Sequence, residues 1–136
     1  MTLAVGDTAP AFRLPTTEGG TASLADMSEA AAAVVVAFWC NHCPYVRAWE
    51  DRFMEVAREY APRGVATVAI CANDAVSHPG DSFEAMAARA AERGYPFPYA
   101  RDDSQEVPRA YGAERTPEVF VVDGEGRVAY HGAIDD

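Results

Sequence analysis

Apolar and polar positions along this chain fall into blocks that predict alternating strands and helices. The run Ala33–Phe38 is apolar and valine-rich, and Val65–Cys71 has the same character, which is typical of buried strands. Between these runs, a set of apolar residues recurs at helical spacing: Val46, Trp49, Phe53, Val56, Ala57 and Tyr60. A strand, a helix and a second strand in this order imply a parallel crossover, and therefore an α/β fold.

The flanking segments predict shorter elements around this centre. Short extended runs bounded by turn residues predict strands at Ala11–Leu14, Thr21–Ser23, Glu118–Val122 and Arg127–His131. The first two form an N-terminal β-hairpin, and the last two form a hairpin around the turn at 123–126. Asp81-Ser82-Phe83-Glu84 resembles a capping box with Asp81 as the cap of a helix that Gly94 ends. The segment 95–99 alternates aromatic residues with proline, which excludes helix and favours packing.

Length and charge limit the classes of protein. The chain has 136 residues, enough for one domain over 1–136 with one core. Its formal net charge is -10, so nucleic acid and anionic membranes are poor partners. Met1 to Pro10 lacks the basic and apolar regions of a signal peptide, and no stretch is long enough to span a membrane. We therefore expect a cytoplasmic protein.

The candidate chemistry lies in Trp39-Cys40-Asn41-His42-Cys43-Pro44, where the central strand becomes a helix. If Cys40 caps that helix, the amides of the next three residues have no intrahelical partner. These amides and the helix dipole favour a thiolate, which is the reactive form of cysteine. Cys43 lies one turn further on and can resolve a mixed disulfide on Cys40. A protonated His42 would stabilise the Cys40 thiolate further and make the couple more oxidising.

Less reactive roles for these cysteines have to be weighed. A pair of cysteines two residues apart can be half of a zinc site, but structural zinc takes four ligands, usually from a second close pair. The remaining candidates, Cys71, His78 and His131, are scattered. We therefore predict no metal. Cys71 ends a predicted strand, where a cysteine is usually a small apolar residue, and its proximity to Cys40 is left open.

Thr116-Pro117 directly precedes a strand that is expected to lie beside the two cysteines. A cis bond before Pro117 would turn the Thr116 backbone toward Cys40 and leave its polar groups available to an extended substrate chain. A trans turn proline is the alternative.

These features together resemble the redoxin group of thioredoxin-like proteins, related to the alkyl hydroperoxide reductase/thiol-specific antioxidant group. The resemblance rests on the segment 38–46, Asn73-Asp74, Pro96-Phe97-Pro98-Tyr99 and Thr116-Pro117, and it runs along nearly the whole chain. It implies a thioredoxin-like fold with a central mixed β-sheet flanked by helices. It also implies Cys40 as the nucleophile, Cys43 as the resolving cysteine and Pro117 as a cis-proline. Trp39, Thr116 and Pro117 are the expected substrate-binding residues.

The chain departs from this group in three ways. The buried acid that thioredoxins carry on the central strand is absent from Val34-Val35-Val36, so deprotonation of Cys43 needs another group or water. The Thr and Pro that precede the reactive cysteine of peroxiredoxins are missing. The sequence stops after the last strand, where relatives continue into a C-terminal helix. We expect that a partner copy covers the exposed apolar face or that the chain is shortened.

The leading interpretation is a thiol–disulfide oxidoreductase that acts through Cys40, Cys43 and His42 and needs no cofactor. Its partners would be a protein or small-molecule disulfide and an unknown recycling reductant. Two alternatives are kept: a peroxiredoxin-like peroxide reductase that uses the same cysteines, and a non-catalytic metal-binding or docking module.

Overall fold

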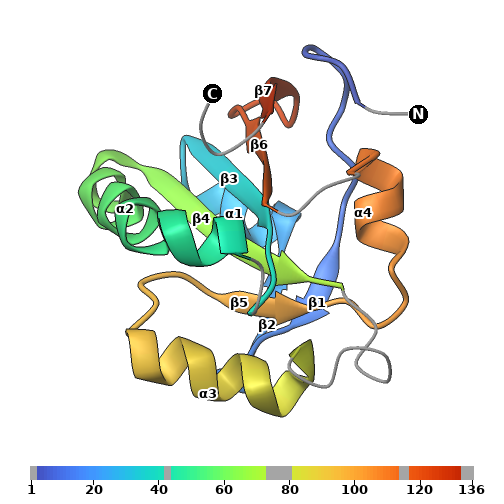
Figure 1. The fold of residues 1–136 in the computed structure, drawn as a ribbon. Helices are drawn as coiled ribbons and strands as arrows, with labels where there is room; N and C mark the ends of the chain where they lie inside the picture. The colour runs from blue at the N-terminus through green and yellow to red at the C-terminus, as the bar shows by residue number, and fades with distance from the viewer. Residues whose placement is uncertain (1–2, 42–43, 73–80, 114–116, 133–136) are drawn as a thin grey trace.

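The computed structural model describes residues 3–41, 44–72, 81–113 and 117–132. Its larger helices are α2 (Pro44–Tyr60) and α3 (Phe83–Arg93), and the shorter ones are α1 (Leu24–Ala30), α4 (Glu106–Tyr111) and the 3-10 turn η1 (Ala61–Arg63). Its strands are β1 (Arg13–Pro15), β2 (Thr21–Ser23), β3 (Ala33–Phe38), β4 (Val65–Cys71), β5 (Tyr99–Arg101), β6 (Glu118–Val122) and β7 (Val128–Gly132). Figure 1 shows these elements as a central sheet with helices on both sides.

The described strands form a mixed sheet in the order β5-β4-β3-β6-β7, beside a separate β1-β2 hairpin. β3 lies at the centre, parallel to β4 and antiparallel to β6. The register pairs Phe38 with Ile70 of β4 and with Glu118 of β6. The carboxyl ends of β3 and β4 and the start of β6 therefore lie at the same end of the sheet. The predicted α/β class, the N-terminal hairpin and the β6-β7 hairpin are confirmed.

The two faces of the sheet bury different side chains, because neighbouring residues of a strand point to opposite faces. On one face Val34, Val36 and Phe38 pack with residues of the N-terminal hairpin, α1 and α4. On the other face Ala37 and Trp39 pack under α2 and α3. The second face is the one that carries Cys40.

The buried side of α2 differs from the predicted one. Val46, Phe53 and Ala57 are buried as expected, but Val56 is 43% exposed and Tyr60 is 40% exposed. In their place the helix buries Glu50, at 1% exposure, together with Met54. An acid is tolerated at this inward position because two arginines and a tyrosine surround its carboxylate, as described below.

The start of α3 also corrects a prediction. Ser82, not Asp81, is the N-cap, and its hydroxyl accepts a hydrogen bond from the Ala85 N–H at 3.1 Å. The helix ends at Gly94 as predicted, in the left-handed conformation with φ +66°. Asp81 therefore has a different partner, which lies in the candidate site.

On the α2 face, Val35 and Val121 are only partly buried, and Tyr130 is 44% exposed. That a second copy of the chain covers this side stays a prediction. Within the described ranges, no helix has the length and apolar character needed to cross a membrane.

Candidate functional site

Trp39 and Cys40 extend the central strand toward α2. The Trp39 N–H donates to the Ile70 carbonyl at 2.8 Å, so pairing with β4 continues one residue past β3. Cys40 follows with an exposed fraction of 0%, and α2 is described from Pro44 onward. The structure thus places Cys40 between a strand end and a helix, as predicted. A substrate that reacts with its sulfur would have to displace part of the surrounding atoms.

The other predicted site residues are only partly described. His42, Cys43 and Thr116 lie outside the described residues. Pro117 is half-buried directly before β6. Because Phe38 pairs with Glu118 in antiparallel register, Pro117 lies level with Trp39, on the strand beside the candidate cysteine.

The Trp39 side chain supports the site from inside. It is 1% exposed, its ring centroid lies 4.9 Å from that of Phe53, and its indole N–H donates to the Tyr95 hydroxyl at 3.2 Å. Direct contact with a substrate, which was predicted for Trp39, would need this side chain to become exposed.

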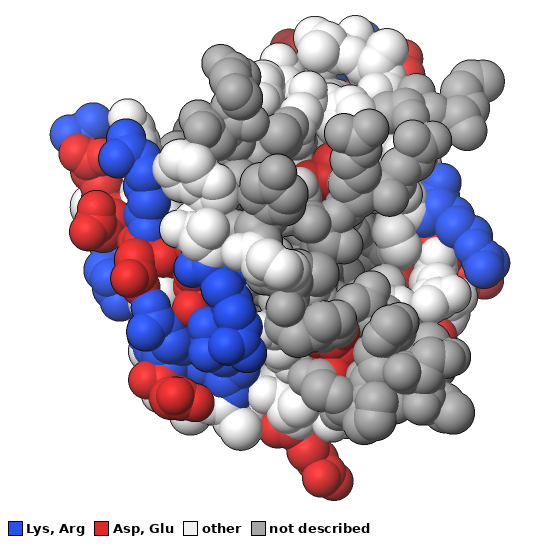
Figure 2. All heavy atoms as spheres, viewed as in Figure 1, with Lys and Arg blue, Asp and Glu red and all other residues white. Residues whose placement is uncertain are grey.

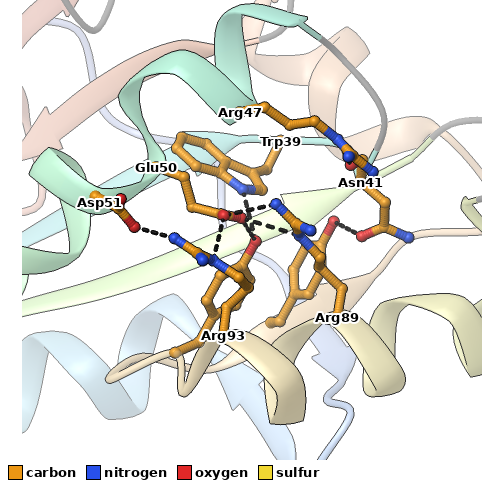
Figure 3. A network of polar contacts seen from close by, with 9 residues as sticks. Trp39, Asn41, Arg47, Glu50, Asp51, Arg89 and Arg93 are labelled. Atoms are coloured by element: carbon orange, nitrogen blue, oxygen red, sulfur yellow. Dashed lines mark hydrogen bonds and ion pairs between the residues drawn. The ribbon is translucent and has the colours of Figure 1, made fainter.

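A buried carboxylate below Trp39 completes a polar network (Figure 3). The Tyr95 hydroxyl donates to Glu50 Oε2 at 2.5 Å, and Arg89 donates to Glu50 Oε1 at 2.6 Å. Arg93 Nε lies 2.7 Å from Glu50 Oε1, in an ion pair that is not aligned as a hydrogen bond. Burial and the hydrogen bond to Glu50 raise the pKa of Tyr95. The Tyr95 hydroxyl is therefore neutral and links the acid to Trp39.

A second buried network holds Asn41, the residue after Cys40. The Asn41 N–H donates to Asp81 Oδ1 at 2.8 Å, and the Tyr99 hydroxyl donates to Asn41 Oδ1 at 2.8 Å. Arg47, on the first turn of α2, donates through Nε to the Asn41 carbonyl at 3.1 Å. Burial raises the pKa of Tyr99 well above its usual value of 10.0, with smaller contributions from Cys71, Tyr95 and Asp81. Tyr99 therefore stays a hydrogen-bond donor at neutral pH.

This network corrects one expectation about the cysteine. The Asn41 amide was predicted to be among the groups available to the Cys40 sulfur, but the Asp81 carboxylate accepts its hydrogen bond. The physical reason is that Ser82 already caps α3, which leaves the Asp81 side chain available for Asn41.

Cys71 lies on the same face, at the end of β4. It is reduced and buried, and Arg101 Nη1 donates to its sulfur at 3.6 Å and to the Asp81 carbonyl at 2.7 Å. Arg101 also pairs through Nε with Asp103 at 2.8 Å. Cys71 and Cys40 belong to the same buried cluster, and Cys71 lies beside Tyr99, which holds the Asn41 side chain.

The possible metal ligands do not converge in the described residues. His131 pairs with Glu118 and stacks on Phe120, with ring centroids 4.2 Å apart. Phe120 belongs to the opposite face from Cys40. His78 lies outside the described ranges, and within them no three His, Cys, Asp or Glu side chains are grouped as around a metal ion.

Sequence reasoning missed Glu50, Tyr95, Asp81 and Tyr99. Glu50 carried a signal, because it lies four residues after Val46 and three before Phe53, which places it on the apolar side of the helix. Asp81 carried none, since Asp and Ser are equally good helix caps.

A mixed sheet with helices on both faces, and a cysteine between its central strand and the next helix, defines the thioredoxin-like class. The AhpC/TSA family model matches residues 5–131, and the chain belongs to this family. It is thus a member of a family of thiol–disulfide oxidoreductases and peroxiredoxin-like proteins.

Solved structures agree with this assignment. An uncharacterized conserved protein from Geobacillus kaustophilus is 42% identical, with a TM-score of 0.94 over 98% of this chain and 70% of that chain. A hypothetical protein from Sinorhizobium meliloti is 40% identical, with a TM-score of 0.94 over 100% of this chain and 74% of that one.

A third structure, from Chlorobium tepidum and provisionally named as the thiol:disulfide interchange protein DsbE, is 27% identical. Its TM-score is 0.79 over 97% of this chain and 86% of that chain. A comparison with curated protein sequences finds no match.

Proposed function

We propose that this protein is a thiol–disulfide oxidoreductase in which Cys40 is the nucleophile and Cys43 the resolving cysteine. The observation that carries the proposal is the position of Cys40, between the end of the central strand and α2, in a member of this thiol-redox family. The similarity to a protein named for thiol:disulfide interchange supports the same reaction class. Protein or small-molecule disulfides are the proposed substrates.

The reaction needs no group beyond the two thiols and the substrate. The Cys40 thiolate attacks one sulfur of a substrate disulfide, forms a mixed disulfide and releases the other substrate sulfur as a thiolate. The Cys43 thiolate then attacks the Cys40 sulfur and releases the second substrate thiolate. The substrate gains two electrons, the protein is left with a Cys40–Cys43 disulfide, and a recycling dithiol reverses the process.

Three variants test the assignment. Cys40→Ser should abolish disulfide reduction, and Cys43→Ser should accumulate a mixed disulfide detectable by mass spectrometry. Cys71→Ala tests the third cysteine: turnover that continues in this variant assigns the reaction to Cys40 and Cys43. Full activity of Cys40→Ser, or a Cys40–Cys43 disulfide that forms at no glutathione ratio, would refute the proposal.

Peroxide reduction by the same cysteines is the second candidate, because the matched family includes peroxiredoxin-like proteins. In that case Cys40 would attack a peroxide oxygen, release water or an alcohol and become a sulfenic acid, which Cys43 would condense to the disulfide. A peroxide-consumption assay separates the two activities. Turnover of peroxide much faster than turnover of disulfides would favour the second.

A further inference from the structure

Asp81 is a buried carboxylate whose only structural task suggested by the sequence, capping α3, is performed by its neighbour. Its exposed fraction is 0%, and Ser82 provides the cap. Asp81 Oδ1 instead lies 2.8 Å from the backbone nitrogen of Asn41. Burying a carboxylate costs desolvation free energy. Helix capping does not offset this cost for Asp81, whereas its hydrogen bond to the residue after Cys40 does so in part.

The geometry brings this carboxylate close to the Cys40 sulfur. Four covalent bonds separate the Asn41 nitrogen from Cys40 Sγ, so the carboxylate oxygen lies within about 8 Å of that sulfur. A unit charge at such a distance, away from bulk water, changes the stability of a thiolate measurably. The hydrogen bond also occupies an amide that could otherwise stabilise the thiolate.

Besides Asp81, hydrogen bonds join Asn41 to one neutral and one cationic side chain. Tyr99 is a neutral donor to the Asn41 side chain, and Cys71 lies beside it. Arg47 bonds to the Asn41 carbonyl, and Arg101 bonds to the Asp81 carbonyl. Among these groups Asp81 alone disfavours negative charge on Cys40, and the two arginines act in the opposite direction.

We propose that Asp81 is a positioning and tuning residue that holds the Asn41 amide and disfavours the Cys40 thiolate, so that the disulfide form of the protein is stabilised. This rests on the proposed function. It makes the couple more reducing than the Cys40-Asn41-His42-Cys43 sequence alone suggests. It also gives the site a buried acid at a different place from the central strand, where Val34 and Val36 fill the interior.

The first test is Asp81→Asn in a Cys43→Ser, Cys71→Ala background, in which Cys40 is the remaining thiol. Asparagine keeps the volume and an acceptor oxygen for the Asn41 N–H but removes the charge. The thiolate absorbance of Cys40, followed against pH, should shift to lower pH by about one unit. Arg101→Gln, which keeps Asp81 and removes the neighbouring cation, should shift the titration to higher pH.

The second test measures the dithiol itself. With Cys40 and Cys43 present, Asp81→Asn should lower the equilibrium constant for oxidation by glutathione roughly three- to tenfold, where tenfold corresponds to about 30 mV. Asp103→Asn is the matched control: it removes the same charge from a side chain that is 86% exposed and pairs with the same Arg101, and the shift should stay below about twofold.

The outcomes separate the two proposals. Unchanged titrations in Asp81→Asn and in Arg101→Gln would overturn the tuning role, because a purely structural hydrogen bond survives in asparagine. Shifts of the Cys40 titration in opposite directions in these two variants would establish a charge effect. The direction of each shift is sufficient for this conclusion, whatever its size. A wild-type protein that forms no Cys40–Cys43 disulfide would refute the proposed function, whereas the Cys40 titration would still report on Asp81.

Discussion

The two faces of the central sheet are built by different rules. The face under the N-terminal hairpin, α1 and α4 is packed by apolar and aromatic side chains, with Phe38, Tyr111 and Phe120 in edge-on contact at centroid distances of 5.1–5.8 Å. The face under α2 and α3 buries two acids, Glu50 at 1% and Asp81 at 0% exposure, whose hydrogen bonds lead toward Cys40. The acids buried away from that face have local tasks instead: Asp102 accepts a hydrogen bond from the Val107 N–H of α4, and Glu118 pairs with His131.

The difference follows the position of Cys40. Both buried acids of the second face connect to residues beside the cysteine, Glu50 through Tyr95 to Trp39, and Asp81 directly to Asn41. Burying polar groups costs desolvation free energy. In return, a network whose members are hydrogen-bonded fixes the orientation of their side chains. We infer that the apolar face provides most of the stability, and that the polar face gives up some of it to hold the site in one arrangement.

Charged side chains of both signs line the surface that α2 and α3 form over the polar face. Figure 2 shows Arg and Asp/Glu side chains interspersed along the side formed by α2 and α3. Asp51 illustrates this: it is 78% exposed and pairs with Arg93, which also reaches the buried Glu50. Glu50 and Asp51 therefore pair with the same arginine, one in the interior and the other at the surface.

The largest effect is expected at the apolar face. Phe120→Ala removes a ring that is 0% exposed and contacts Phe38, Tyr111 and His131, and it should lower the free energy of unfolding by about 3–5 kcal/mol. Urea unfolding followed by circular dichroism measures this.

The neighbouring Val121 offers a control on the same strand. Val121 is half-buried and points to the other face, so Val121→Ala should cost about 1 kcal/mol or less. As long as the Phe120→Ala variant remains folded, the reduction potential of its Cys40–Cys43 pair should be unchanged. Equal costs for the two substitutions would contradict the division of roles between the faces.

The next largest effect is expected at Glu50. Glu50→Gln keeps the shape but removes the charge that pairs with Arg89 and Arg93, and we expect a loss of about 2–4 kcal/mol. The expected loss of unfolding free energy is smaller than for a fully buried ion pair, because the side chains of Arg89 and Arg93 are 17% and 34% exposed. The same unfolding experiment measures it.

Asp51→Asn is the control for this prediction. It removes an exposed acid from the same helix and the same Arg93, and should cost less than about 0.5 kcal/mol. If the two substitutions cost the same, the Glu50 network would be no more important than a surface ion pair.

The sequence predicted the fold because the fold depends on local patterns. The apolar runs of β3 and β4, the turn residues at 123–126 and the glycine after α3 each point to one element, and all were found there. The position of Cys40 follows from the same patterns, since it lies where a strand signal changes to a helical one.

The networks around the site could not be predicted because they join residues far apart in sequence. Asn41 and Asp81 are 40 positions apart, and Trp39 and Tyr95 are 56 apart. The strand order and the helix packing decide whether such pairs meet. Glu50 shows the same limit: its spacing places it on the apolar side of α2, but its pairing with Arg89 and Arg93 of α3 depends on how the two helices pack.

The smallest effect concerns two tyrosines, one from each face. Tyr111 donates to the Pro10 carbonyl at 2.7 Å, whereas Tyr95 both accepts from Trp39 and donates to Glu50. At neutral pH, Tyr95→Phe should therefore cost about 1 kcal/mol more than Tyr111→Phe: it leaves the buried Trp39 N–H without its acceptor and takes one of several donors from Glu50, whereas Tyr111→Phe affects one half-buried carbonyl. Urea unfolding of the two variants side by side measures the difference.

The pH dependence of stability should be the same for the two tyrosines, although they lie on different faces of the sheet. Burial raises the pKa of Tyr95 and of Tyr111 in the folded protein above the usual 10.0. Their contribution to stability is thus complete below about pH 10 and is lost as the pH rises from there toward the folded values, by up to about 1.4 kcal/mol per pH unit for each tyrosine. Each variant should lessen this alkaline loss equally, although their costs at pH 7 differ. If Tyr95→Phe lessened the alkaline loss of stability and Tyr111→Phe did not, burial alone would not keep Tyr111 neutral. The hydrogen bonds of the polar face would then determine both the cost at pH 7 and the alkaline loss.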